Sequence, residues 1–148
     1  MFTSFKNIFK NTNVKVESPK DEYKVACTAL LCEAASMDGV FDENENKLIL
    51  VLIKKQFNVD DNEANKIYTE GKMLAENSSQ LYGFTRVIKD SWEIEKRISL
   101  LEMLWELAYV DGELDATEDM LIRRIAGLIH VEDRDRIEAK QRVLKNIK

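Results

Sequence analysis

The sequence predicts an all-α fold, a bundle of about seven short helices in two pseudo-symmetric halves, with a further short amphipathic helix at the N-terminus. Three observations lead to this prediction. The 148 residues include only 5 Gly and 1 Pro, too few turn-forming residues for an all-β chain of this length. Apolar residues recur at helical spacing along most of the chain. One phrase of sequence occurs twice, which indicates an internal repeat.

The chain divides into an N-terminal segment with its linker, residues 1–17, and a helical domain, residues 18–148. The first ten residues place their apolar side chains at helical spacing and two lysines off that stripe, which predicts an amphipathic helix. Two interpretations fit this helix, since it can fold onto its own domain or contact an anionic membrane surface. The apolar residues are Phe2, Phe5, Ile8 and Phe9, and the lysines are Lys6 and Lys10.

Capping residues and polar breaks mark the helix boundaries within the domain. Ser18 followed by Pro19 is a strong helix start, because Ser caps free amides and Pro at the first helical position sacrifices no hydrogen bond. Asp60, with Glu63 three residues later, restarts a helix after the break at residues 58–60. The expected helices cover residues 18–37, 42–56, 60–76, 81–90, 91–110, 115–129 and 133–147.

The apolar positions of these helices supply the expected core. The helix at 18–37 is expected to bury one face, and both tryptophans are expected in the core or at helix contacts. Cys27 and Cys32 lie five residues apart, which matches neither a CxxC pair nor a zinc ligand pair, so we expect reduced thiols in a buried setting. The expected core positions are Val25, Ala29, Leu30, Ala34, Met37, Leu48, Ile49, Leu52, Ile53, Leu81, Phe84, Val87, Ile88, Ile98, Leu101, Leu104, Trp105 and Ala108.

An internal repeat relates the two halves of the domain. The phrase SMDGVFDENEN, residues 36–46, returns 73 residues later as YVDGELDATED, residues 109–119. A helix, an acidic turn, a second helix and a restart are therefore used twice, which predicts two equivalent helical halves related by an approximate two-fold. The aligned segments are 32–39 with 105–112 and 48–49 with 121–122, both at an offset of 73, and 57–61 with 129–133 at an offset of 72.

Each acidic turn contains the residues of a helix–helix connection. Gly39 and Gly112 suit a helix C-cap, because Gly adopts positive φ without a Cβ penalty. An Asp three residues later suits the N-cap of the next helix, and a Glu three residues after that completes a capping box. The two predicted capping pairs are Asp42 with Glu45 and Asp115 with Glu118.

Capping does not account for every carboxylate in these turns. Carboxylates on adjacent turns repel one another, and a hard divalent cation with oxygen ligands relieves that repulsion. The pattern is not an EF-hand, because the sixth residue counted from Asp38 is Glu43 instead of Gly and the twelfth is Ile49 instead of Glu. Any cation site here therefore has a different geometry. The crowded acids are Asp38, Asp42, Glu43 and Glu45 in the first turn and Asp111, Glu113, Asp115, Glu118 and Asp119 in the second.

These residues resemble the TerB-like family, named for tellurite resistance, whose signature is a helix ending in a small-residue-Asp-Gly turn followed by Asp and Glu, present twice. The similarity spans roughly residues 21–142. The chain departs from the signature in having Met37 and Val110 where the family often has Ala, an exchange of one apolar residue for another. The motifs that carry the resemblance are ALLCEAASMDG at 29–39, YGFT at 82–85, LWELAYVDG at 104–112 and EDMLIRR at 118–124.

The resemblance implies clustered acids that bind divalent cations, and a cytoplasmic role in stress response or tellurite resistance, often beside membrane-associated complexes. Oxygen ligands favour Ca²⁺ or Mg²⁺. A related domain heads a membrane-anchored J-domain co-chaperone, so the alternative function is an interaction module whose acidic face meets a basic protein partner, with metal incidental. Carried over from the family, the metal ligands are Asp38, Asp42, Glu45, Asp111, Asp115 and Glu118.

Composition and motifs argue against several other functions. The net charge of -5 disfavours nucleic acid as a partner, because phosphate binding needs clustered Lys and Arg. His130 lies where a helix ends, so a contact with the helix dipole is favoured over catalysis, and the glycines form no phosphate loop. We therefore expect a protein that is not an enzyme.

Localisation follows from the lack of membrane and export signals. No apolar run approaches the ~18 residues that a bilayer span needs, and the N-terminus lacks the apolar run and cleavage site of a secretory signal. The sequence predicts a cytoplasmic protein. The membrane interpretation of the N-terminal helix adds peripheral contact at the inner face of the membrane.

Overall fold

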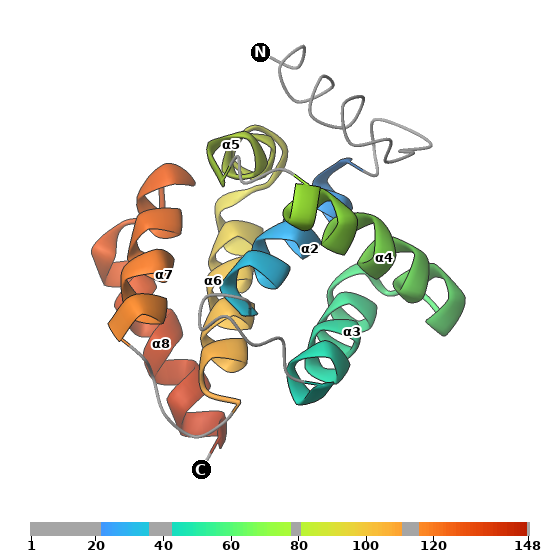
Figure 1. Cartoon of the computed structure of the whole chain (residues 1–148). Coiled ribbons are helices and arrows are strands. Elements are labelled where there is room, and N and C mark those ends of the chain that lie inside the picture. The colour runs from blue at the N-terminus through green and yellow to red at the C-terminus, as the bar shows by residue number, and fades with distance from the viewer. Residues whose placement is uncertain (1–21, 36–42, 78–80, 111–115, 148) are drawn as a thin grey trace.

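The computed structural model describes residues 22–35, 43–77, 81–110 and 116–147 (Figure 1). Within these ranges the chain forms seven α-helices and no strand, which confirms the all-α prediction. No helix in the described ranges is long and apolar enough to cross a membrane. The helices are α2 (Glu22–Ala35), α3 (Glu43–Phe57), α4 (Asp61–Asn77), α5 (Leu81–Ser91), α6 (Ile94–Ala108), α7 (Ala116–Leu128) and α8 (Asp133–Ile147).

The predicted helix boundaries lie close to the observed ones, except at the junction of α5 and α6. Ser91 was expected to start a helix, but it ends α5, and α6 begins at Ile94 with Glu93 in extended backbone as its N-cap. The indole of Trp92 is buried against Tyr23 and Phe57, at ring-centroid distances of 5.8 and 6.1 Å. Burying this ring places the bend between the helices after Ser91. The predicted start at Ser18 and Pro19 lies outside the described residues.

Helix α2 lies at the centre of the bundle and packs against α3, α4, α5 and α6 (Figure 1). The prediction of a single buried face was wrong, since every residue from Val25 to Cys32 is at most 3% exposed. A helix that is apolar on all sides is typical of a buried position. The polar exception, Thr28, donates its hydroxyl to the carbonyl of Lys24 at 2.8 Å, so no buried donor is left unpaired there.

Gly71 allows α4 to approach α2 closely. A Cβ built on Gly71 would lie 2.5 Å from Cγ2 of Thr28 and 3.2 Å from the backbone nitrogen of Ala29. Such distances leave no room for a methyl group, so this isolated glycine in a helical pattern marks a point of helix–helix contact.

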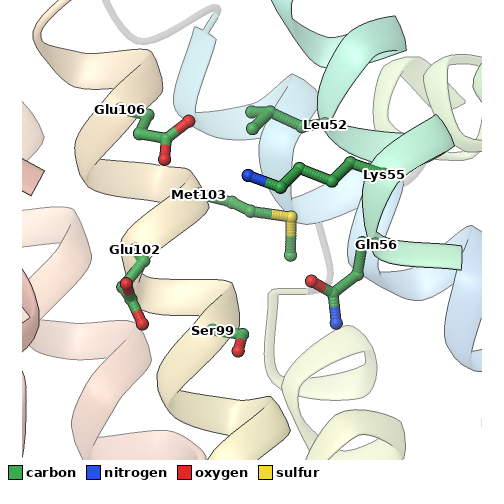
Figure 2. Close-up of a pocket in the computed structure, with 7 residues that line it drawn as sticks. All are labelled: Leu52, Lys55, Gln56, Ser99, Glu102, Met103 and Glu106. Atoms are coloured by element: carbon green, nitrogen blue, oxygen red, sulfur yellow. The ribbon is translucent and has the colours of Figure 1, made fainter. Parts of the chain in front are cut away.

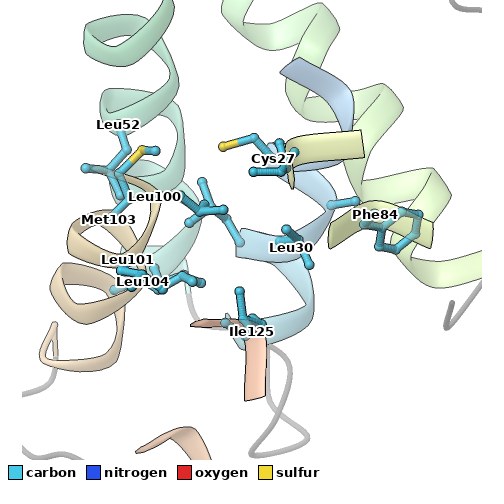
Figure 3. Packing of buried hydrophobic residues seen from close by; sticks show 14 of the residues in the cluster. Cys27, Leu30, Leu52, Phe84, Leu100, Leu101, Met103, Leu104 and Ile125 are labelled. Carbon is cyan, nitrogen blue, oxygen red and sulfur yellow. The ribbon is translucent and has the colours of Figure 1, made fainter. Parts of the chain in front are cut away.

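The hydrophobic core combines side chains from both halves of the repeat. Figure 3 shows Leu30 of α2 between Phe84 of α5 and Ile125 of α7, with Leu101 and Leu104 of α6 nearby. The predicted core positions with described side chains are buried, except Leu48 and Ile98, which are partly buried against the same cluster. Met37 and the side chain of Leu81 are not described. The two halves therefore share one core.

The predicted repeat is visible in the backbone. Asn58 and His130, which are equivalent at an offset of 72, are the only non-glycine residues with positive φ in the described ranges, at 51° and 58°. After each of them, a valine amide donates back to a carbonyl five residues earlier, Val59 to Lys54 at 3.3 Å and Val131 to Ala126 at 2.9 Å. This is the Schellman ending of a helix. Helices α3 and α7 therefore end in the same way.

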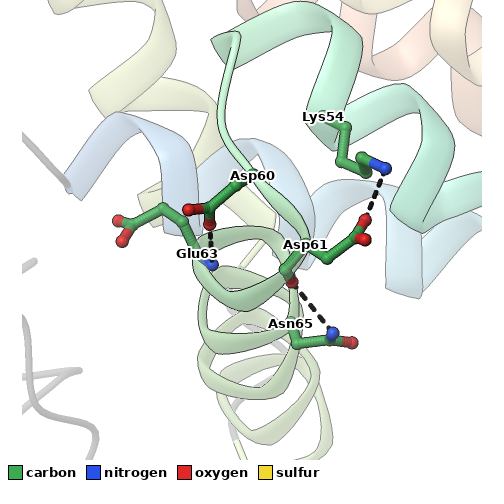
Figure 4. Close-up of polar contacts among 5 residues, drawn as sticks. All are labelled: Lys54, Asp60, Asp61, Glu63 and Asn65. Atoms are coloured by element: carbon green, nitrogen blue, oxygen red, sulfur yellow. Dashed lines mark hydrogen bonds and ion pairs between the residues drawn. The ribbon is translucent and has the colours of Figure 1, made fainter.

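The restart predicted at Asp60 is confirmed in Figure 4. The carboxylate of Asp60 accepts a hydrogen bond from the amide of Glu63 at 2.8 Å, as expected of an N-cap. Lys54 near the end of α3 forms an ion pair with Asp61, the first residue of α4. The backbone carbonyl of Asp61 in turn accepts a hydrogen bond from the side-chain Nδ2 of Asn65 at 2.9 Å. These contacts fix the turn between α3 and α4.

Candidate functional site

A small cavity lies where the two acidic turns leave and re-enter the described helices. It is lined by the last turns of α2 and α6 and by the first turns of α3 and α7, and its volume is about 10 Å³. That is room for about one water-sized particle. Six of its seven lining residues form three pairs that are equivalent at an offset of 73, so the cavity lies on the approximate two-fold axis. The pairs are Ala34 with Leu107, Ala35 with Ala108, and Glu45 with Glu118, and Val110 completes the lining.

The predicted metal ligands fall into two groups. Glu45 and Glu118 are described, half-buried, and line the axial cavity together. The other four, Asp38, Asp42, Asp111 and Asp115, lie outside the described residues, as do the predicted caps Gly39 and Gly112. In the part of the chain that is described, no three His, Cys, Asp or Glu residues are placed to hold a metal ion. The six-residue ligand set therefore stays a prediction.

Asp119 takes part in a separate cluster of charges on α6, α7 and α8. Its carboxylate lies 3.1 Å from Nε of Arg123 and 3.8 Å from Nζ of Lys140. The same Lys140 amino group lies 5.0 Å from the centroid of the Trp105 ring, a cation–π distance. Two cations already compensate the charge of Asp119, so we do not count it among the cation ligands.

This cluster has a counterpart in the first half that sequence reasoning missed. By the repeat, Asp119 is equivalent to Asn46 and Lys140 to Tyr68, at offsets of 73 and 72. The hydroxyl of Tyr68 donates a hydrogen bond to Oδ1 of Asn46. A neutral hydrogen bond therefore takes the place that an ion pair has in the second half. An alignment of the two halves contains the signal for this pair. Both Asp119 and Lys140 of the second half are replaced in the first half, by Asn46 and Tyr68.

Two half-buried glutamates, Glu33 and Glu106, occupy equivalent positions one turn before the acidic turns. Burial raises the pKa of Glu33. Burial also raises the pKa of Glu106, Lys55 opposes that effect, and Glu102 adds to it. Each half thus places a carboxylate in a setting that penalises its charge.

Figure 2 shows a larger polar groove beside Glu106, between α3 and α6. Its volume is about 250 Å³. Lys55 and Gln56 face Glu102, Glu106 and Ser99 across it. Leu52 and Met103 also line it, and each is 5% exposed. Sequence reasoning did not identify this groove.

The two cysteines and the histidine are not arranged for nucleophilic catalysis. Cys27 and Cys32 are buried and free. Burial raises the pKa of both thiols, to about 12 for Cys32, so neither is a thiolate at neutral pH. His130 is exposed at the end of α7, and the cation at the neighbouring carbonyl of Ile129 is Arg97, which donates to it at 2.9 Å. The expectation of reduced, buried thiols is confirmed.

The comparisons with known proteins give one family. The family model described as tellurite resistance protein TerB matches residues 24–141. No curated protein and no solved structure matches the chain. The matched range starts in α2 and ends in α8, so it contains both copies of the repeat and the axial cavity.

Proposed function

The chain belongs to the family of the tellurite resistance protein TerB and has a domain of that type, and we propose that it is a non-enzymatic cytoplasmic stress-response protein whose two acidic turns bind divalent cations. Ca²⁺ and Mg²⁺ are favoured because every proposed ligand is a carboxylate oxygen. The proposed ligands are Asp38, Asp42, Glu45, Asp111, Asp115 and Glu118.

The observation that carries this proposal is the shared cavity on the two-fold axis. Glu45 and Glu118 come from different halves of the sequence, yet both line it. The last turns of α2 and α6, which lead into the two acidic turns, also line this cavity. Carboxylate oxygens that border so small a space are the hard oxygen ligands that Ca²⁺ and Mg²⁺ prefer. This supports cation binding by the two turns in concert.

Calorimetric titration of the whole chain with CaCl₂ and with MgCl₂ tests the proposal. We expect binding tighter than millimolar, and a loss of affinity of about tenfold or more, equal to about 1.4 kcal/mol, in an Asp38→Asn/Asp111→Asn double variant. Affinity no tighter than millimolar that is unchanged in the double variant contradicts cation binding.

A matched set of glutamates separates ligand loss from a general loss of charge. Glu45, Glu118 and Glu63 are each the third residue of a helix, of α3, α7 and α4 respectively. We expect Glu45→Gln and Glu118→Gln to weaken cation binding by similar factors. Glu63→Gln should leave it unchanged, because Glu63 lies in an exposed turn away from the axial cavity.

An interaction module is the second candidate function. Glu43 is exposed and Glu45 is half-exposed at the start of α3, so a basic protein surface has access to both. This function predicts capture of a partner that weakens with salt, persists in chelator and disappears when the acids are neutralised. Capture that needs Ca²⁺ or Mg²⁺ supports cation binding instead.

A further inference from the structure

Helix α5 joins the two halves of the domain. It packs against α2 of the first half and α7 of the second. Under the approximate two-fold, α2 is equivalent to α6 and α7 to α3. A counterpart of α5 would therefore pack against α6 and α3.

The polar groove occupies that equivalent position, and no described helix packs along it. Its residues on α6 include Ser99, Glu102 and Met103. Their equivalents on α2 at an offset of 73 are Ala26, Ala29 and Leu30, all of which are fully buried. One face of the central helix pair is thus covered, and its symmetric counterpart forms a groove of about 250 Å³.

The N-terminal segment repeats the apolar pattern of α5. In α5 the pattern is Leu-x-x-Phe-x-x-Val-Ile-Lys, residues 81–89, and in the segment it is Phe-x-x-Phe-x-x-Ile-Phe-Lys, residues 2–10. The spacing is the same at every apolar position. The segment also precedes α2 along the chain as α5 precedes α6, so its place in the order of the repeat matches that of α5.

The segment carries two lysines, and the groove is lined by two glutamates and one lysine, Lys55; Glu102 also lies 3.6 Å from Arg142 on α8. Lys6 and Lys10 are four residues apart, as are Glu102 and Glu106 on the groove wall. The position of α5 that matches Lys6 is Thr85, which is 1% exposed and therefore faces the domain. A lysine at the corresponding position would meet Glu102 where α2 carries Ala29, whereas Glu106 and its equivalent Glu33 are the same residue type in both halves.

The start of α2 lies within reach of the groove. Tyr23 contacts Phe57 at a ring-centroid distance of 5.9 Å, and Phe57 follows Gln56, which lines the groove. Residues 11–21 connect the segment to α2 and can span up to roughly 35 Å when extended. The linker is thus long enough for the segment to occupy the groove of its own chain.

We propose that residues 2–10 form a helix that docks intramolecularly in the groove between α3 and α6, with Phe5, Ile8 and Phe9 on Leu52 and Met103, and Lys6 and Lys10 paired with Glu102 and Glu106. This docked helix is the symmetry counterpart of α5. It is independent of cation binding at the acidic turns.

Zero-length carbodiimide cross-linking of the dilute full chain, followed by peptide mass spectrometry, tests the docking. We expect Lys6 or Lys10 to be joined to Glu102 or Glu106 within one chain, and rarely to Glu138, an exposed carboxylate on α8. The methyl resonance of Met103 should shift when residues 2–10 are deleted. A Phe5→Asp/Phe9→Asp variant should lose most of the cross-link, whereas Ser4→Asp/Asn7→Asp, with the same added charge on the polar face, should retain it.

Three results would overturn the docking. The first is a Met103 resonance that does not respond to the deletion. The second is cross-links formed only between two chains, which would place a second copy in the groove. The third is a segment that partitions onto anionic vesicles while the cross-link to Glu102 or Glu106 is never seen. All variants keep residues 18–148 intact, so circular dichroism can verify that the domain is folded.

Discussion

Asn58 and His130 have the same left-handed backbone conformation at the ends of two equivalent helices, 72 residues apart. Asn tolerates this conformation better than His, because its short side chain hydrogen-bonds locally. We expect His130→Gly to stabilise the protein by roughly 0.5–1 kcal/mol, the relief of strain less the added entropy of the unfolded chain. Asn58→Gly should stabilise the protein by a smaller amount. Urea unfolding checks both, with His130→Ala as the control that retains the Cβ, and a larger gain at Asn58 would contradict the argument.

Substitution of Gly by Ala should have opposite effects on stability at Gly71, which contacts α2 closely, and at Gly127, which does not. Gly71→Ala should destabilise by about 1–2 kcal/mol, since a clash with Thr28 and the backbone of Ala29 outweighs the helical preference of Ala. Gly127→Ala in α7 meets nothing within 4 Å and should stabilise by about 0.5–1 kcal/mol. Thermal unfolding of the two variants measures the difference. Equal effects would mean that α2 and α4 can separate at little cost.

The cluster of Asp119, Lys140 and Trp105 should contribute a measurable coupling. A double-mutant cycle with Asp119→Asn and Lys140→Met is expected to give about 0.5–1 kcal/mol, because both side chains are largely buried and the lysine also lies over the indole. The control cycle is Arg134 with Glu138, whose side chains are 85% and 52% exposed. Its coupling should be near zero. A coupling free energy between Asp119 and Lys140 no larger than that of the control would contradict a stabilising role for this cluster.

The raised pKa of Glu33 predicts a pH-dependent effect of its neutral analogue. Burial raises the pKa of this carboxyl in the folded state above its unfolded value, so its ionised form costs stability at pH values above the folded pKa. Below the unfolded pKa both states are protonated and the cost is absent. Glu33→Gln should therefore raise the melting temperature at pH 7 and change it little at pH 4. A larger increase in melting temperature at pH 4 than at pH 7 would contradict a raised pKa of Glu33 in the folded state.

The sequence was sufficient for the features that depend on local patterns. Asp60 as a helix start and the buried tryptophans follow from capping chemistry and apolar spacing, and the matching helix ends at Asn58 and His130 follow from the repeat. The bend at Trp92 did not follow, because Ser91 also fits a helix start and only the buried contacts of the indole ring place the break after it.

Other features depend on how many helices surround a given residue. Ala26 and Thr28 look like ordinary helix residues in the sequence, and they are buried because α2 has neighbours on every side. The repeat likewise made Glu45 and Glu118 equivalent without showing that both border one cavity. That meeting is set by the packing of α2 against α6, which no local pattern encodes.

Because α5 packs against α2 of one half and α7 of the other, neither half of the repeat is expected to fold by itself. Residues 1–77 and 81–148, produced as separate polypeptides, would each expose the apolar surface that the other covers. We therefore expect the two fragments to be unstructured alone and to assemble into the native bundle when mixed. The two halves of the repeat would then form a single cooperative folding unit.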